Sequence, residues 1–173
     1  MNPIELLLPP SQTRRALLLL LAAVAILAAA WSVQELGFKP CELCFKERYA
    51  FYAGAPIAAL TAWLASRSAH AAARGLFVLL ALIFLANAGL AFYHVGVEQH
   101  WWAGPSACTG ALTAPLNVND LAKAVNVEPV VPCDVPPLWI FGLSLAAWDV
   151  VVSAAMAIYA ALASRLPKSF AHF

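Results

Sequence analysis

The residues of this chain best suited to chemistry are four cysteines, and two of them lie close together. Cys41 and Cys44 are separated by two residues, whereas Cys108 and Cys133 follow much later. A thiol pair at the start of a helix can exchange electrons with a disulfide, because the positive helix end favours the thiolate that attacks sulfur. A permanent cross-link over a two-residue gap would restrain almost nothing. The spacing therefore indicates a redox-active pair.

Four cysteines allow three disulfide pairings. We expect Cys41 to pair with Cys44 and Cys108 with Cys133, because the first two are neighbours and the other two flank a flexible segment. Two other interpretations stay open, namely that both pairs are structural disulfides, or that all four thiolates bind zinc. Zinc sites usually combine two close pairs, and Cys108 and Cys133 are far apart in sequence. No metal ligand is predicted for this reason.

The composition indicates that these cysteines belong to a membrane protein. Hydrophobic residues make up 63% of the 173 residues and charged residues 11%, and the mean hydropathy is +0.79. A water-soluble domain of this length could not bury so much apolar surface. The net charge of +1 gives no reason to expect nucleic acid as a partner.

Four apolar segments are long enough to cross about 30 Å of hydrocarbon at about 1.5 Å per residue. They predict an all-α fold, namely an integral membrane four-helix bundle that forms one domain over residues 1–173. The predicted membrane spans are residues 16–35, 49–66, 75–96 and 138–163, and the predicted loops are residues 36–48 and 97–137. The first segment also resembles a signal peptide, since Arg14 and Arg15 precede it. Its apolar run is longer than a usual signal core, so a retained helix is expected.

Basic residues at the helix ends predict the orientation. Six lie on one side of the predicted bundle and four on the other; the six are Arg14, Arg15, Arg67, Arg74, Arg165 and Lys168, and the four are Lys39, Lys46, Arg48 and Lys123. Basic residues are retained on the cytoplasmic side, so both termini are predicted to be cytoplasmic and both loops external, which in a bacterial inner membrane is the periplasmic side. All four cysteines then face the compartment in which disulfides persist.

Three groups of residues together form a more specific pattern than any Cys-x-x-Cys alone. They are the run KPCELCFKER from Lys39 to Arg48, then Tyr93-His94 with Glu98, and then Cys108 and Cys133 ahead of Phe141-Gly142-Leu143-Ser144. In these features the chain resembles the disulfide bond formation protein B (DsbB) family over nearly its whole length.

The resemblance implies a bacterial inner-membrane enzyme, a quinone-dependent thiol oxidase. Its partner would be a DsbA-like periplasmic thioredoxin-fold oxidase, and its electron acceptor would be ubiquinone or menaquinone. The resemblance further implies that Cys108 and Cys133 meet the reduced partner, and that Cys41 and Cys44 pass the electrons on. Cys44 would face the quinone, with Arg48 beside both.

Two further residues are expected near the acceptor. Arg48 follows Cys44 by four residues, so both share a helix face, and its charge would lower the pKa of the Cys44 thiol and hold a thiolate beside the quinone. An arginine that only reaches toward the membrane surface is the alternative. His94 is expected to donate a hydrogen bond to the quinone, or else to be a packing residue. Asp149, deep in the last apolar segment, is assigned no catalytic role and could face Asn87.

Two other functions remain open. A specialised relative could serve one dedicated thiol oxidase, and a non-enzymatic membrane scaffold could be held together by two disulfides. A vitamin K epoxide reductase-like enzyme would be expected to carry its close cysteine pair near the last helix, whereas here the pair precedes the second segment.

Overall fold

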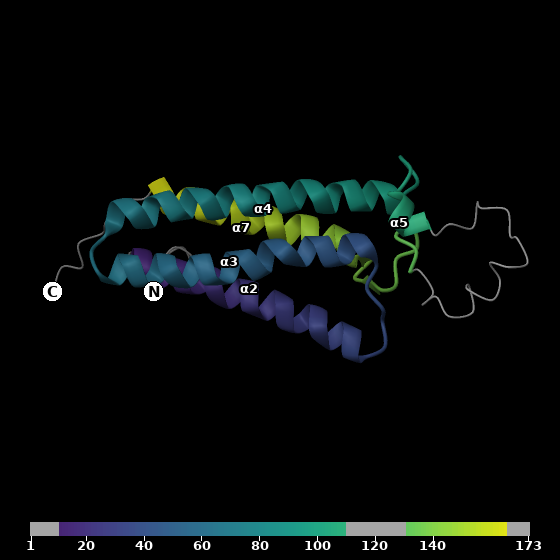
Figure 1. Cartoon of the computed structure of the whole chain (residues 1–173), viewed down its shortest axis with the longest axis horizontal. Coiled ribbons are helices and arrows are strands. Elements are labelled where there is room, and N and C mark those ends of the chain that lie inside the picture. The colour runs from purple at the N-terminus through teal and green to yellow at the C-terminus, as the bar shows by residue number, and fades with distance from the viewer. Residues whose placement is uncertain (1–10, 110–130, 166–173) are drawn as a thin grey trace, which may run out of the picture.

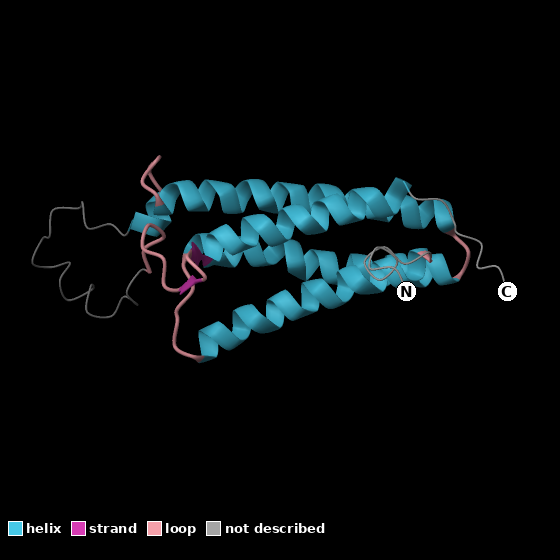
Figure 2. Cartoon of the chain, turned by 180° about the vertical axis from the view of Figure 1, so that it is seen from behind, coloured by secondary structure: helices cyan, strands magenta, loops and turns pink. Residues whose placement is uncertain are grey.

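The computed structural model describes residues 11–109 and 131–165 and is dominated by four long antiparallel helices (Figure 1). These helices are α2 (Gln12–Glu35), α3 (Glu42–Ser66), α4 (His70–Glu98) and α7 (Leu145–Arg165). A short helix α5 (Ser106–Thr109) and a hairpin of β1 (Trp139–Ile140) and β2 (Leu143–Ser144) lie at one end of the bundle (Figure 2). The predicted all-α four-helix architecture is confirmed.

All four helix starts differ from the predicted spans, and the two largest differences, in α3 and α7, depend on capping residues. Helix α3 begins at Glu42, not at 49, because the Cys41 sulfur accepts the backbone N–H of Cys44 at 3.3 Å. Helix α7 begins at Leu145, not at 138, because residues 139–144 form the hairpin and the Ser144 hydroxyl accepts a backbone N–H of the first helical turn. The predicted loop at 36–48 is therefore shorter, and Cys44 belongs to a helix.

Among the described residues, α2, α4 and α7 are long and apolar enough to cross a membrane. Helix α3 is not in this group, because its hydropathy is lower. Its first turns carry charged residues, and the rest of the helix contains tyrosines, Pro56 and Thr61 among the apolar residues. The chain is thus a multi-pass membrane protein, and a fourth span in α3 stays a prediction.

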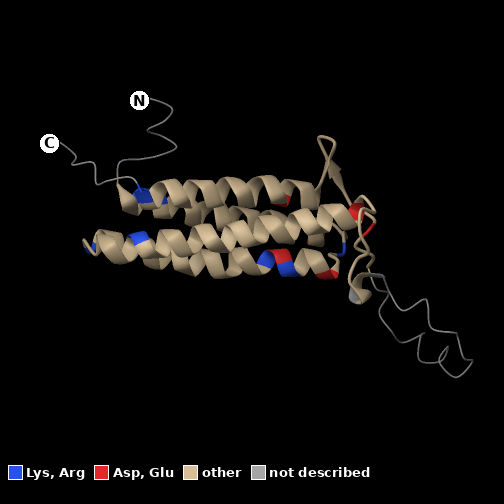
Figure 3. Ribbon diagram, turned by 90° about the horizontal axis from the view of Figure 1, so that it is seen from above, with Lys and Arg blue, Asp and Glu red and all other residues tan. Residues whose placement is uncertain are grey.

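Charge is distributed unevenly along the bundle (Figure 3). The end that contains the start of α2, the 66–70 link and the end of α7 carries basic residues, which are Arg14, Arg15, Arg67, Arg74 and Arg165. The opposite end, with the cysteines, carries both signs. This agrees with the predicted orientation, which itself stays a prediction, and two residues of that count, Lys123 and Lys168, lie outside the described residues.

The helices pack in the order α2, α3, α4, α7, while α2 and α7 make few contacts with each other. Most of the interior is alanine together with the buried rings of Phe51, Phe77 and Phe84. Helix α2 diverges from the other three toward its Glu35 end (Figures 1 and 2). This divergence separates α2 from α7 at the end that holds the cysteines.

Gly54 allows α3 and α4 to approach closely. A Cβ at position 54 would lie 2.7 Å from Cζ of Phe84, whose ring is fully buried and packs against Phe51 with centroids 5.7 Å apart. We expect Gly54→Ala to lower the free energy of unfolding by at least about 1 kcal/mol, because the ring must move in a close-packed core. Denaturation in mixed micelles measures this effect.

The matched controls are Gly75→Ala and Gly89→Ala in α4, where an added Cβ meets nothing within 4 Å. Both controls should be neutral or slightly stabilising, because alanine favours the helix over glycine. Equal destabilisation by all three substitutions would contradict the close-packing argument.

Candidate redox site

Cys41 and Cys44 lie at the N-terminus of α3, before the predicted span at 49–66. Cys41 is the N-cap residue, with φ −78° and ψ 175°, and Cys44 lies in the first turn. Their sulfur atoms are 2.7 Å apart and both residues are free thiols in the structure. The predicted pair is therefore brought together, here in its reduced form instead of the expected disulfide.

The two thiols differ in acidity. A hydrogen bond from the Cys44 thiol lowers the pKa of Cys41, with help from His94 and the Cys44 backbone N–H, and burial opposes this effect. The same sulfur–sulfur hydrogen bond, together with burial, raises the pKa of Cys44. The expected lowering of the Cys44 pKa by Arg48 is therefore not found in the reduced pair, in which Cys41 is the more acidic of the two thiols.

His94 approaches the pair from the end of α4. Its Nε2 atom lies 3.6 Å from the Cys41 sulfur, and its Nδ1 atom lies 2.7 Å from Oε1 of Glu47. All three side chains are buried. A carboxylate on one ring nitrogen orients the imidazole and leaves the other nitrogen for the sulfur. His94 thus lies beside Cys41, and its predicted contact with a quinone stays a prediction.

Glu47 is a site residue that sequence reasoning missed, since no catalytic or binding role was assigned to it. A signal was present, because Leu43, Glu47 and Phe51 are four residues apart and therefore share one face of α3. Leu43 and Phe51 are buried in the structure, and Glu47 is only 7% exposed. A carboxylate in the middle of an apolar helix face needs a partner, and here the partner is His94.

The second cysteine pair forms a disulfide. Cys108, in α5, is bonded to Cys133 with an S–S distance of 2.04 Å, which confirms the predicted pairing. Both residues are buried in one apolar cluster with Cys41, Leu43 and Val97, and Cys44 packs at the edge of that cluster. The two pairs are thus neighbours, and a zinc site made of four thiolates is incompatible with this disulfide.

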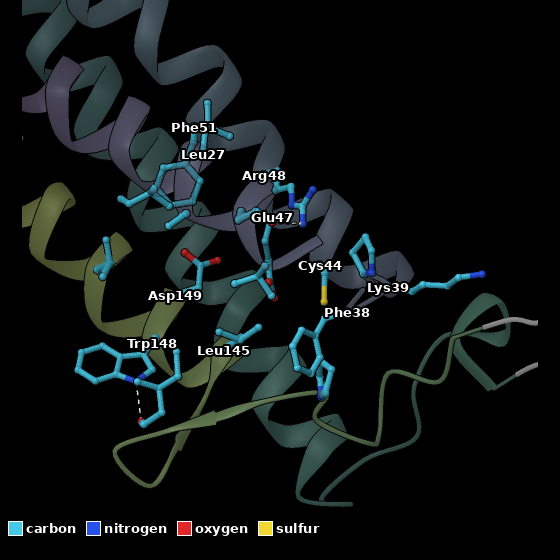
Figure 4. A pocket seen from close by; sticks show the side chains of 18 residues that line it. Leu27, Phe38, Lys39, Cys44, Glu47, Arg48, Phe51, Leu145, Trp148 and Asp149 are labelled. Carbon is cyan, nitrogen blue, oxygen red and sulfur yellow. Dashed lines mark hydrogen bonds between the residues drawn. The ribbon is translucent and has the colours of Figure 1, made fainter. Parts of the chain in front are cut away.

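A cavity of about 260 Å³ lies on the other side of Cys44 (Figure 4). Its walls come from α2, α3, α7 and the β-hairpin, and most of its lining is apolar. The lining also includes the thiol of Cys44 and four ionisable residues, Lys39, Glu47, Arg48 and Asp149, of which Lys39 extends away from the others (Figure 4). Cys41 and His94 are not among the lining residues. Cys44 therefore separates the cavity from the buried cluster of sulfurs.

Arg48 lines the same cavity as Cys44, as their shared helix face predicted. Its guanidinium donates to Oε1 of Gln34 at 2.9 Å and to the carbonyl of Ala30 at 3.3 Å, and it lies 5.4 Å from the ring centre of Phe45. These contacts tie α3 to the diverging end of α2. Arg48 thus holds the cavity wall and keeps a permanent positive charge at its edge.

Asp149 also lines the cavity, and its partner is Asn87, as the sequence suggested. The Asn87 amide donates to the two carboxylate oxygens at 3.3 and 3.1 Å and to the Ser153 hydroxyl at 2.9 Å. Ser153 donates in turn to Asp149 at 2.8 Å. Because α7 starts at Leu145, Asp149 lies close to the start of this helix and not deep within it.

The hairpin between the loop disulfide and α7 is held by polar contacts at its base. The Ser144 hydroxyl donates to the carboxylate of Glu98 at the end of α4. The indole of Trp148 donates to the carbonyl of Ile140 at 2.9 Å, and Ile140 lines the cavity. The hairpin is therefore a fixed wall of the cavity.

Comparison with known proteins agrees with this geometry. The family model described as disulfide bond formation protein DsbB matches residues 12–163, which include all four cysteines. The chain belongs to the DsbB family. No curated protein and no solved structure gives a significant match. Membership of the DsbB family implies an oxidoreductase role in disulfide formation, in a family that is generally linked to quinones.

Proposed function

We propose that this DsbB family member is a quinone-dependent thiol oxidase of the bacterial inner membrane. It reoxidises a DsbA-like periplasmic oxidase and passes the electrons to ubiquinone or menaquinone. One observation carries the proposal: the Cys41–Cys44 pair lies between a buried cluster that contains the Cys108–Cys133 disulfide and a cavity that Cys44 lines. The loop disulfide, the Cys41–Cys44 pair and the cavity that we propose as the acceptor site thus follow one another in space.

The sulfur steps are two successive disulfide exchanges. A thiolate of the reduced partner attacks the Cys108–Cys133 disulfide, and its second thiol resolves the mixed disulfide, so the partner leaves oxidised. One of the two new thiolates then attacks an oxidised Cys41–Cys44 pair, and the loop disulfide forms again. The product is the Cys41–Cys44 dithiol described above. Each exchange conserves electrons, so an unfavourable step proceeds only if a later acceptor removes them.

The cavity suits a quinone as that acceptor. A quinone ring is flat and apolar with two carbonyl oxygens that accept hydrogen bonds, and the cavity offers apolar walls with the Arg48 guanidinium and the Cys44 thiol at its edge. A bound quinone would take up two electrons and two protons as the Cys41–Cys44 disulfide forms. The Cys44 sulfur lines the cavity, and the Arg48 guanidinium would orient a ligand there by binding its carbonyl oxygen or its negatively charged group.

For His94 the geometry favours a role beside Cys41 over the predicted contact with the quinone. Its Nε2 atom faces the Cys41 sulfur and its Nδ1 atom is held by Glu47. In this position the imidazole stabilises a Cys41 thiolate and can hold the proton that Cys41 gives up.

The proposal is tested by anaerobic mixing of the purified protein with a reduced thioredoxin-fold oxidase and a soluble quinone. We expect the quinone absorbance to fall while the oxidase becomes oxidised in equal amounts over many turnovers. Failure to reduce any benzoquinone or naphthoquinone derivative would reject the proposal.

Arg48→Gln should impair quinone reduction more than exchange with the thiol partner. A hydrogen bond to a charged group contributes about 1.5–3 kcal/mol, so a decrease of roughly 10-fold or more in the quinone rate is expected. Lys46→Gln is the matched control, because Lys46 is an exposed cation of the same helix that pairs with Glu42 at 3.3 Å. Equal loss of both activities in Arg48→Gln would count against a role at the acceptor.

A further inference from the structure

We propose that the reduced Cys41–Cys44 pair and His94 form a binding site for a soft divalent cation of the Zn²⁺ and Cd²⁺ class. The site differs from the four-thiolate zinc site considered from the sequence. It has two sulfur ligands and one nitrogen ligand, and it exists only while the pair is reduced, because a sulfur in a disulfide is not a thiolate ligand.

The distances among the three ligand atoms suit tetrahedral coordination. All three atoms lie within 4.8 Å of one another. With Zn–S bonds of about 2.3 Å and Zn–N bonds of about 2.0–2.1 Å, the sulfur–nitrogen edge of a tetrahedron is about 3.5 Å. The observed distance from the Cys41 sulfur to Nε2 of His94 is 3.6 Å. The distance between the Cys41 sulfur and Nε2 of His94 therefore already suits a bound Zn²⁺.

The sulfur–sulfur edge must widen when a cation binds. It measures 2.7 Å in the structure, against about 3.8 Å for two thiolates on one tetrahedral Zn²⁺. A movement of the Cys44 side chain supplies the difference, since Cys44 is partly exposed and faces the cavity, whereas Cys41 and His94 are buried. The fourth coordination position then points toward the cavity, where water can occupy it.

The surroundings of the three ligands independently resemble those of a metal site. A histidine that binds metal almost always donates its second ring N–H to a carboxylate, a carbonyl or water, and His94 has Glu47 at 2.7 Å in this position. The Cys41 sulfur accepts the backbone N–H of Cys44, which stabilises a thiolate. Two thiolates neutralise the charge of a divalent cation, so the cation and its two sulfur ligands add no net charge to the buried site.

Binding is a proton exchange and not a redox step. The cation forms bonds to both sulfurs and to Nε2 of His94, and two protons are released to solvent, namely the proton of the Cys44 thiol and the proton that His94 holds for Cys41. If the proposed function holds, a bound cation prevents Cys41 and Cys44 from closing their disulfide. Soft divalent cations are then inhibitors that act on the reduced enzyme.

The experiment uses the full chain in detergent micelles, with Cys108→Ser and Cys133→Ser so that only Cys41 and Cys44 carry thiols. Reduced protein is titrated with Cd²⁺ and the sulfur-to-cadmium charge-transfer absorbance is recorded. We expect one Cd²⁺ per reduced chain and none per oxidised chain. X-ray absorption of the Zn²⁺-loaded protein should show two sulfur ligands at about 2.3 Å and one imidazole nitrogen at about 2.0–2.1 Å.

Variants identify the nitrogen ligand. Glu47→Gln should weaken Cd²⁺ binding by about 10–100-fold through the orientation of the imidazole, and His94→Ala should weaken it further. His100→Ala is the matched control, because His100 is exposed and lies beside Asp134, and it should bind like the parent.

Three results would overturn the site: binding to the oxidised chain, a single sulfur ligand in the absorption spectrum, or parental affinity in both Glu47→Gln and a folded His94→Ala. If His94→Ala does not fold, Glu47→Gln and the ligand count decide. Neither partner nor quinone is present, so this result is independent of the proposed function.

Discussion

Cys44→Ser is expected to abolish quinone reduction while one round of exchange with the thiol partner survives. The substitution removes the sulfur that lines the cavity and leaves the Cys108–Cys133 disulfide intact. Cys41 has then lost the residue with which it forms its own disulfide, so the electrons cannot pass to an acceptor in the cavity. Stopped-flow quinone absorbance should match the rate without enzyme, and gel analysis of trapped thiols should show one equivalent of partner oxidised per chain.

Cys108→Ser is the reciprocal variant and should show the opposite pattern. It destroys the loop disulfide, so oxidation of the partner should be lost. A small dithiol such as dithiothreitol should still deliver electrons to Cys41 and Cys44, because Cys44 is partly exposed, and quinone reduction from that donor should persist. A disulfide-stapled scaffold would show no redox change in either variant, and loss of both activities in both variants would contradict a sequential relay.

Asn87→Leu is expected to cause a large loss of stability. The amide donates to both oxygens of the Asp149 carboxylate and to Ser153, across the contact between α4 and α7. Hydrogen bonds between membrane helices average about 0.6 kcal/mol each. The two N–H groups of the amide serve these three acceptors, so two such bonds and a carboxylate left short of donors together give about 2 kcal/mol. Mixed-micelle denaturation of the parent and the variant measures the difference.

The control for this prediction is the double variant Asn87→Leu with Asp149→Leu. Replacing both partners by apolar groups leaves no unsatisfied carboxylate, so most of the lost stability should return. If the double variant is less stable than Asn87→Leu alone, the hydrogen bonds are not the cause. The rate of quinone reduction by the double variant is a separate measurement, which tests whether Asp149 in the cavity wall contributes to binding of the acceptor.

The sequence predicted the architecture and the main chemical groups because these depend on local patterns. Apolar runs indicated four helices, and the spacing of Cys41 and Cys44 indicated a reactive pair at a helix start. The pairing of Cys108 with Cys133 followed from their position around one loop, and Asn87 was a plausible partner for Asp149. The helices and the cysteine pairs were predicted from residues close together in one segment or around one loop. The contact of Asn87 with Asp149 was predicted because a polar residue in an apolar environment needs a partner.

The rest depended on contacts between segments, which no local pattern contains. The start of α7 was misplaced because residues 139–144 are as apolar as a helix, although they form a hairpin. The approach of His94 to Cys41, over 53 positions of sequence, depends on how α3 and α4 pack. The acidity of the thiols was assigned to the wrong cysteine, because the deciding hydrogen bond comes from Cys44 itself and not from Arg48.

The volume of the cavity has a consequence for acceptor choice. About 260 Å³ accommodates a substituted aromatic ring, but not the isoprenoid tail of a lipid-soluble quinone. In the proposed function, the tail of the quinone therefore remains among the acyl chains, and recognition falls on the ring substituents alone. Tail length could then differ from one host to another without any compensating change in the protein.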